Sequence, residues 1–422
     1  ASVVAIAFFV YGMRITPVIC TLLNLFLANM VVDNSLSGMK NGYKFEIVTD
    51  KPEELSAELI QTLKHGVTEI RVQGMYSHTE KFMLVCDGAF DFLALKSYFA
   101  DIDIPHIRFS AFSVNPLYED VVKGVELLRS ENCDAIVAVG GGSSIDVAKC
   151  IKLFAKMASG ENYLKQEFFD SEIPLLALPT TAGTGSESTR YAVIYYDGQK
   201  QSVTHDSIVP DYAILDSTVL KTLPLYQRKC TLLDALCQGI ESWWSVNSTD
   251  ESFGYSEIAV KTIIKNYKAY IFENDDSVLE DILLASNFAG RAINITQTTA
   301  AHALSYKMTS LFSLPHGHAV AIGLPYIWEY MIKNPQKCID PRGKDHLLKV
   351  WELIAKALGC DSPESAVVFF KEMLAEMGIE APKSTDDELG VLAASVNPVR
   401  LKNNPVELDH KTLYTLYTKI TE

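Results

Sequence analysis

The stretch Val137-Ala-Val-Gly-Gly-Gly-Ser-Ser-Ile-Asp-Val-Ala-Lys149 decides the fold of this chain. An apolar strand, predicted over 135–139, runs into three glycines, and a helix is expected to begin near Ser143. Glycines have no Cβ atom, so their backbone N–H groups can approach a pyrophosphate at the positive end of a helix. Taken alone, the turn also fits an ordinary tight connection between a strand and a helix.

Further motifs narrow the interpretation. A second polar loop, Thr180-Thr-Ala-Gly-Thr-Gly-Ser-Glu187, follows the glycine turn, and Asp234, His302 and His316 follow later. Carboxylate and imidazole groups are common ligands of catalytic metals. Together the segments predict a nucleotide site beside a metal site.

With these motifs, the chain resembles the iron-containing (group III) alcohol dehydrogenase family over residues 83–422, with glycerol dehydrogenase and dehydroquinate synthase as kin. The Gly-Gly-Gly-Ser-x-x-Asp-x-x-Lys turn and the Thr-Thr-x-Gly-Thr-x-x-Glu loop carry the resemblance, together with the Asn115-Pro116 turn. The resemblance implies that both loops hold NAD or NADP. The implied cofactor-binding residues are Asn115, Gly141, Gly142, Ser143, Asp146, Thr180, Thr181, Thr184 and Lys200.

The order of apolar segments predicts the fold of the nucleotide part, over 83–224. Strands expected at 82–86, 107–109 and 135–139 alternate with helices expected at 90–100 and 118–131, which indicates a parallel sheet flanked by helices. Asp87 ends the first strand, where a carboxylate can accept hydrogen bonds from the adenosine ribose and repel a 2′-phosphate. This favours NAD over NADP, although Asp87-Gly88 is also a typical turn.

From about residue 225 to 422 the pattern is helical, with helices expected at 227–245, 252–273 and 277–297. The resemblance implies an all-helical domain of the dehydroquinate synthase type that binds a divalent metal. Asp234 and Gln238 share one helix face at i and i+4, and the separation of 14 positions between His302 and His316 equals the family spacing. Relatives carry histidine where Gln238 stands, so Fe²⁺, Zn²⁺ and manganese all stay open. The alternative is a surface aspartate and structural histidines.

Two more residues are candidates for proton transfer. Tyr306 stands four residues after His302, where many family members have another histidine, and His318 lies two residues after His316. Ordinary packing is the alternative for both. Trp243 and Trp244 could line a substrate pocket, but buried aromatic residues are more often core.

Composition restricts the class of protein. The 422 residues carry a net charge of −15 and are 48% hydrophobic, which suits a large enzyme and argues against nucleic-acid binding. The eight cysteines show no paired spacing, so reduced thiols in a cytosolic setting are expected.

The first 82 residues differ from the rest. Apolar runs at 3–10 and 16–32 predict membrane helices over 1–34, with a buried pair of soluble helices as the alternative. Residues 35–82 resemble the small cytosolic α/β domain of YitT-type membrane proteins through Lys51-Pro-Glu-Glu54, Gly66-Val-Thr68 and Gly74-Met-Tyr-Ser77. These features predict a cytoplasmic catalytic part tethered to the bacterial inner membrane. The first residue is Ala1, as in a fragment, and a genuine fusion, a truncated gene and an assembly artefact all stay open.

The expected activity is hydride transfer between NAD(P)H and a small aldehyde or alcohol, by an enzyme that forms a homo-oligomer. Residues 234–249 resemble the branch that contains phosphonoacetaldehyde reductases, and residues 315–323 are similar to dehydroquinate synthase. The leading substrate is therefore a small aldehyde with an anionic group. The alternatives are a carbon–oxygen lyase that keeps NAD bound, and a non-catalytic membrane-protein fusion fragment.

Overall fold

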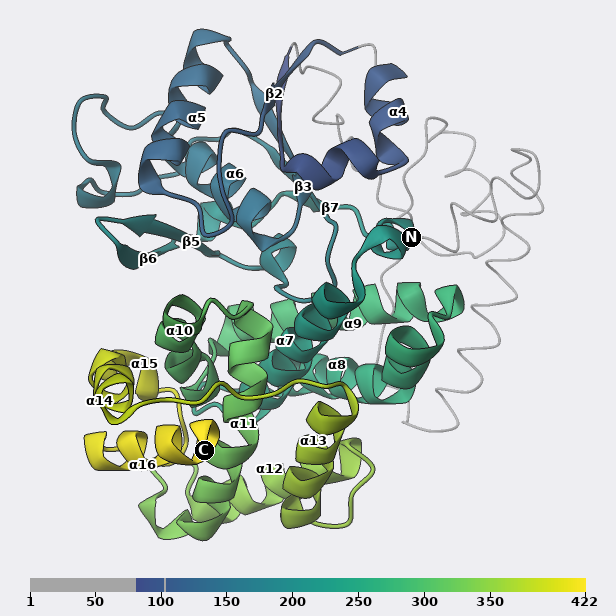
Figure 1. Cartoon of the computed structure of the whole chain (residues 1–422). Helices are drawn as coiled ribbons and strands as arrows, with labels where there is room; N and C mark the ends of the chain where they lie inside the picture. Colours follow the sequence, from purple (N-terminus) through teal and green to yellow (C-terminus); the bar gives the residue numbers. More distant parts are fainter. Residues whose placement is uncertain (1–80, 102–103) are drawn as a thin grey trace, which may run out of the picture. The chain divides into compact units, whose positions relative to one another are not determined.

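The computed structural model describes residues 81–101 and 104–422. The predicted membrane helices over 1–34, and residues 35–80 of the predicted small domain, lie outside this part of the chain. Among the helices that are described, none combines the length and the apolar character needed to cross a membrane. The described residues fall within one compact unit, His78–Glu422, with an α/β part followed by a helical part (Figure 1).

A parallel sheet of five strands forms the core of the α/β part. Its strands are β1 (Phe82–Cys86), β2 (His106–Phe109), β3 (Ala135–Gly140), β4 (Leu175–Pro179) and β7 (Tyr212–Ala213), in the order β2-β1-β3-β4-β7. The strands β1 and β3 are buried along their whole length, as expected for a sheet covered on both faces. The helices of this part are α4 (Leu95–Asp101), α5 (Tyr118–Ser130) and α6 (Gly142–Phe154).

The strand order places the nucleotide crevice. The order reverses between β1 and β3, and ligands of open parallel sheets bind at such a point, outside the carboxyl ends of the strands. Asp87 follows β1 and the glycine turn follows β3, so both motifs lie at this reversal. The predicted positions of Asp87 and of the glycine turn, each at the carboxyl end of a strand, are therefore confirmed.

One predicted helix was wrong. The segment expected as a single helix over 90–100 is a short 3₁₀ turn, Gly88–Phe92, followed by α4. The Asp87 side chain accepts a hydrogen bond from the Ala89 amide and starts the 3₁₀ turn, whereas Leu93 takes an extended conformation that ends it. The hydrogen bond at Asp87 and the extended Leu93 therefore divide the segment that apolar periodicity predicts as one helix.

An antiparallel hairpin, which the sequence analysis did not predict, projects from the α/β part. It consists of β5 (Tyr191–Tyr196) and β6 (Gln199–Thr204), paired from Tyr191 with Thr204 to Tyr196 with Gln199. Asp197 and Gly198 form the turn with φ of 50° and 67°. A two-residue Asp-Gly turn with both φ values positive is favoured in hairpins, and this dipeptide was the signal that could have revealed it.

The helical part is built around α7 (Leu225–Trp244), which packs against α8 (Asp250–Lys268), α9 (Leu279–Thr296) and α11 (His316–Lys333). These α7, α8 and α9 helices correspond to the three predicted ones, and α8 ends in a π turn, Ala269–Glu273. The other helices are α10 (Ala300–Phe312), α12 (Lys344–Ala357), α13 (Pro363–Glu376), α14 (Asp386–Ser395), α15 (Pro398–Leu401) and α16 (His410–Thr421). The predicted fold class, a parallel α/β part followed by a helical part, is confirmed.

Candidate active site between the sheet and the helices

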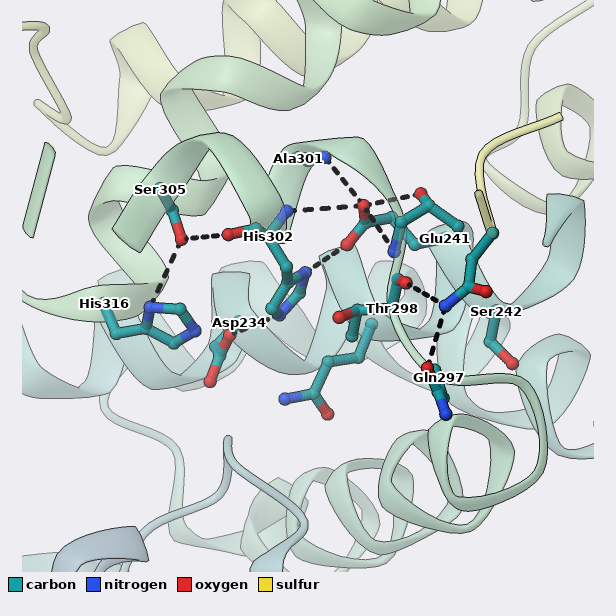
Figure 2. A network of polar contacts seen from close by, with 12 residues as sticks. Asp234, Glu241, Ser242, Gln297, Thr298, Ala301, His302, Ser305 and His316 are labelled. Carbon is teal, nitrogen blue, oxygen red and sulfur yellow. Dashed lines mark hydrogen bonds and ion pairs between the residues drawn. The ribbon is translucent and has the colours of Figure 1, made fainter. Parts of the chain in front are cut away.

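Three helices bring the predicted metal ligands together. Asp234 comes from α7, His302 from α10 and His316 from the first position of α11. One ligand atom from each lies within 4.8 Å of the others. Figure 2 shows the Asp234 carboxylate and the two imidazole rings turned toward one another. His302 and His316 follow Asp234 by 68 and 82 positions, so helix packing is what brings the three side chains together.

The unsatisfied polar atoms at this point fit a bound cation. His302 Nε2 and Asp234 Oδ1 lie 3.3 Å apart, yet neither forms a hydrogen bond within the described part of the chain. The amide oxygen of Gln238 is likewise buried without a partner. Buried acceptors that face each other without donors are costly unless a positive ion lies between them. Three ligands with open positions are typical of a catalytic metal.

Glu241, which the sequence analysis missed, fixes the orientation of the His302 ring. Its Oε2 atom hydrogen-bonds to His302 Nδ1, and its Oε1 atom accepts from the amides of Thr299 and Ala301 and from the Thr299 hydroxyl. A carboxylate can only accept, so Nδ1 carries the proton and Nε2 is left for a metal. Burial opposes the imidazolium, but Glu241 and Asp234 raise the pKa of His302 to about 9 when no metal competes, so a metal that binds at Nε2 replaces a proton there.

The signal for Glu241 was present in the sequence. Asp234, Gln238 and Glu241 stand at i, i+4 and i+7 of α7, which places them along one face over two turns. Glu241 is fully buried. A charged residue on the same face as two ligand candidates was therefore a reasonable candidate for a supporting carboxylate.

The tautomer of His316 follows from its neighbour. The Ser305 hydroxyl donates to the His302 carbonyl at 2.8 Å, so its oxygen is free to accept from His316 Nδ1, 3.4 Å away (Figure 2). This leaves His316 Nε2 without a proton. Burial lowers the pKa of His316 to about 3, which keeps the ring neutral, as a ligand must be.

Gly317 allows α11 to approach α7. A Cβ atom at Gly317 would lie 2.0 Å from the Cys230 carbonyl oxygen and 2.8 Å from Asp234 Cβ. No other residue fits at this position without displacing the two helices. Because His316 precedes Gly317 directly, the close contact sets the distance between His316 and Asp234.

The two nucleotide loops lie against each other at the start of α6. Positions Gly141 and Gly142 face the side chains of Thr181 and Thr184. The first turn of α6 has no acidic residue and no side-chain cap, so its N–H groups are available to an anion. These N–H groups fit the pyrophosphate site that the sequence predicts.

Asp146 and Lys149 of α6 connect this helix to the second loop and to the hairpin. Asp146 accepts from the Ser186 hydroxyl at 2.7 Å and from the Val193 amide at 2.9 Å. Lys149 is fully buried and donates to Ser186, Thr189 and the Tyr191 carbonyl at 2.9–3.1 Å. Burial lowers the pKa of Lys149 to about 8. Both motif residues therefore tie α6 to the second loop and to the hairpin.

A cleft of about 240 Å³ runs from these loops to the metal ligands. It is lined by the following predicted residues: Asn115, Gly142, Ser143, Asp146, Thr184, Lys200, Asp234, Gln238, His302, Tyr306 and His316. Of the other predicted residues, Gly141, Thr180 and Thr181 lie beside it in the two loops. Asp87 lies at the end of β1, where its carboxylate accepts from the Ser144 hydroxyl at 3.2 Å.

His318 does not line the cleft. Its Nε2 atom lies 2.8 Å from the Glu380 carbonyl, which can only accept, and its Nδ1 atom lies 2.8 Å from the Tyr226 hydroxyl. Both ring nitrogens are thus engaged by the protein, which is the packed alternative that the sequence left open. Trp243 and Trp244 are also buried core residues outside the cleft lining.

Tyr306 connects the metal ligands with two basic residues. Its ring stacks on His316 with centroids 5.9 Å apart, and Lys200 Nζ lies 3.3 Å from the centre of the Tyr306 ring. Arg400, which sequence reasoning missed, lines the same cleft from α15. Burial and the positive charge of Arg400 lower the pKa of Lys200 to about 7.

Comparison with known proteins agrees with this architecture. Residues 62–217 match the family model of iron-containing alcohol dehydrogenase, and residues 229–421 match the model of the C-terminal part of the Fe-containing alcohol dehydrogenase family. The first match begins at residue 62, inside the range 35–82 for which the sequence predicts a separate domain. Both motif regions and all three metal ligands fall within the matched ranges.

Two curated relatives have the same sequence identity to this chain. Phosphonoacetaldehyde reductase of Streptomyces viridochromogenes is 31% identical over 70% of this chain and 78% of its own length. Probable alcohol dehydrogenase EutG of Escherichia coli K12 is 31% identical over 72% of this chain and 76% of its own.

Solved structures show the same fold. The iron-containing alcohol dehydrogenase of Thermotoga maritima has a TM-score of 0.69 at 25% identity, covering 90% of this chain and 99% of that one. Sulfoacetaldehyde reductase of Bifidobacterium kashiwanohense, solved in complex with NAD⁺, has a TM-score of 0.73 at 23% identity, covering 90% and 100%.

Proposed function

The chain belongs to the iron-containing alcohol dehydrogenase family, and we propose that the cleft between its sheet and its helices is where it reduces a small aldehyde, phosphonoacetaldehyde being the leading substrate. The protein is a metal-dependent oxidoreductase that transfers hydride between NAD(P)H and an aldehyde or alcohol. The observation that carries the site assignment is the pair of buried, unpartnered acceptors, Asp234 Oδ1 and His302 Nε2, at one end of the cleft.

The nucleotide lies, in this proposal, across the carboxyl ends of β1 and β3. The amides at the start of α6 would hold the pyrophosphate, with the Thr181 and Thr184 side chains of the second loop beside it. Asp87 is placed to accept hydrogen bonds from the adenosine ribose, which favours NAD over NADP. The nicotinamide, when bound, supplies the hydride.

Asp234, His302 and His316 would hold the divalent ion, with Gln238 contributing an amide oxygen. The ion supplies a Lewis acid for the substrate oxygen. Glu241 keeps the His302 Nε2 lone pair directed at the ligand position, and Ser305 does the same for His316. Burial raises the pKa of the Tyr306 phenol, so this group stays protonated and can donate its proton toward the substrate oxygen.

The test uses the full chain, supplied in turn with Fe²⁺, Zn²⁺ and Mn²⁺. Oxidation of NADH and NADPH is followed with phosphonoacetaldehyde and with propionaldehyde, a neutral aldehyde of similar size. Metal-dependent consumption of the nicotinamide should disappear in His302→Ala and persist in His410→Ala, a change on the exposed first turn of α16. A protein that binds metal and nucleotide but never consumes the nucleotide would favour the lyase alternative.

Membrane attachment through residues 1–34, a cytoplasmic position of the catalytic part and assembly into a homo-oligomer stay predictions from the sequence. Membrane fractionation of cells expressing the full chain tests the first two. Sedimentation of the purified protein tests the third.

A further inference from the structure

Two positive side chains of the cleft have not yet been used in the site: Arg400, and Lys200, which the family resemblance predicts to bind the cofactor. Lys200 and Arg400 both line the cleft, and within the described residues neither forms an ion pair or a side-chain hydrogen bond. Asp146 and Asp234 stabilise the charge of Lys200 at longer range, but neither forms an ion pair with it. Asp146 already accepts from Ser186 and Val193, and Asp234 faces His302 in the metal triad.

The two residues reach the cleft from separate elements. Lys200 is on β6 of the hairpin and extends over the Tyr306 ring of α10. Arg400 is on α15, a single turn that packs against α10. Figure 1 shows α15 beside α10 and the hairpin β5–β6 across from α10. The cations therefore approach the same end of the cleft, next to the metal ligands.

The electrostatic environment of Lys200 and Arg400 favours an anion between them. Burial and then the charge of Arg400 lower the pKa of Lys200, and the same charge partly offsets the burial that raises the pKa of Tyr306, so the guanidinium acts on both groups. Two like charges in a partly buried cleft repel each other and are poorly solvated, and an anion placed between them relieves both costs. The guanidinium also offers paired donors that match a phosphonate, sulfonate or carboxylate group.

We propose that Arg400 and Lys200 form a subsite for the anionic group of the substrate, so that the enzyme acts on small aldehydes that carry an oxyanion at the end opposite the carbonyl. This inference rests on the proposed reductase function and deepens it. The Tyr306 ring, stacked on His316 and covered by Lys200, spans the short distance between the metal triad and the subsite.

The pyrophosphate of the nucleotide is a second anion, and its expected site is separate from the subsite of Arg400 and Lys200. Its expected position is the start of α6, between Gly141, Gly142 and the second loop. Lys200 and Arg400 instead lie at the Tyr306 end of the cleft, with the metal ligands. Filling the first position with ADP-ribose therefore separates the two anion sites in an experiment.

The direct test measures binding of methylphosphonate, a non-reactive probe of the anionic group, by calorimetry with the metal-loaded full chain and saturating ADP-ribose. Wild type should bind the probe, and Arg400→Gln should weaken binding roughly ten- to hundredfold, the loss expected for charge-assisted hydrogen bonds. Arg400→Lys, which keeps the charge but not the paired donors, should fall between them. Lys402→Gln removes an exposed charge two residues away, outside the cleft lining, and should change binding less than about twofold.

A kinetic readout tests the same subsite during turnover. The ratio of kcat/KM for phosphonoacetaldehyde to kcat/KM for propionaldehyde should fall about tenfold or more in Arg400→Gln and stay constant in Lys402→Gln. An equal effect of Arg400→Gln on both aldehydes would overturn the subsite. So would wild-type protein that binds no methylphosphonate, a result that needs no variant. Wild type that binds the probe but reduces neither aldehyde would instead overturn the proposed reductase.

Discussion

The Glu241 carboxylate hydrogen-bonds to Nδ1 of His302 and thereby directs Nε2 of the same ring toward Asp234 Oδ1, 3.3 Å away (Figure 2). Glu241 is itself held by the amides of Thr299 and Ala301, which begin α10. The backbone at the start of one helix thus positions a carboxylate of α7, and that carboxylate positions a ligand of α10. The metal site depends on this contact as much as on its ligands.

Glu241→Gln should lower the affinity for the metal about 10- to 100-fold, because an amide supports the His302 tautomer less strongly than a carboxylate. Competition with a coloured chelator measures the dissociation constant of the ion. Glu257→Gln, on the exposed face of α8, is the matched control and should leave it unchanged. Equal affinities of the Glu241→Gln variant and the wild type would show that Glu241 has only a structural role.

Gln238→His should shift metal preference toward Zn²⁺ over Mn²⁺. An imidazole nitrogen suits the softer ion better than the Gln238 amide oxygen, which is buried and without a partner in the described structure. We expect the ratio of bound Zn²⁺ to Mn²⁺ at equal concentrations to rise about tenfold, equivalent to ~1.4 kcal/mol. Elemental analysis after competitive dialysis measures this ratio. The same shift in Gln227→His, an exposed position of α7, would contradict a role for Gln238 at the metal.

Gly317→Ala should destabilise the protein by about 3 kcal/mol, because the new methyl group would overlap the Cys230 carbonyl and force α11 away from α7. The variant should also bind metal more weakly, since His316 moves with α11. Urea unfolding and metal titration check the two effects. Gly254→Ala on exposed α8 has open space around it and should stabilise by roughly 0.5–1 kcal/mol. A stable Gly317→Ala protein with full metal affinity would refute the close-contact argument.

Lys149 should make the free energy of unfolding rise between about pH 8 and pH 10.5. Burial lowers its pKa from 10.5 to about 8, so in this range the unfolded chain holds a proton that the folded chain does not. The stability that this difference contributes is present above pH 10.5 and is lost as the pH falls through 8. Relative to Lys149→Met, the wild type should gain roughly 3 kcal/mol across this window. Urea unfolding at several pH values measures the difference.

Lys156, an exposed lysine in the turn after α6, provides the control for this titration. Lys156→Met removes a surface ion pair with Glu172 and no buried group. If the pH trend relative to wild type is the same for Lys149→Met and Lys156→Met, then burial of Lys149 does not cause it.

Much of the architecture was accessible from the sequence. The apolar runs before and after the glycine turn predicted β1, β3 and α6, because a buried parallel strand and a following helix each have a local signature. The reversal of strand order that places the nucleotide was not visible, since it depends on which strands pair. The hairpin β5–β6 was missed although its Asp197-Gly198 turn was present.

For the site, sequence by itself determined which chemical groups are available: Asp234, His302 and His316 as ligand types, and glycine and threonine loops for a phosphate. Tertiary structure alone decided how they are used. It brought Glu241 behind His302, turned His318 toward Tyr226 and Glu380, and placed Arg400 beside Lys200, 200 residues earlier in the chain. The physical reason is that spacing along one helix predicts a shared face, whereas contacts between helices depend on packing distances that a single close approach, such as Gly317 against Cys230, sets for the whole site.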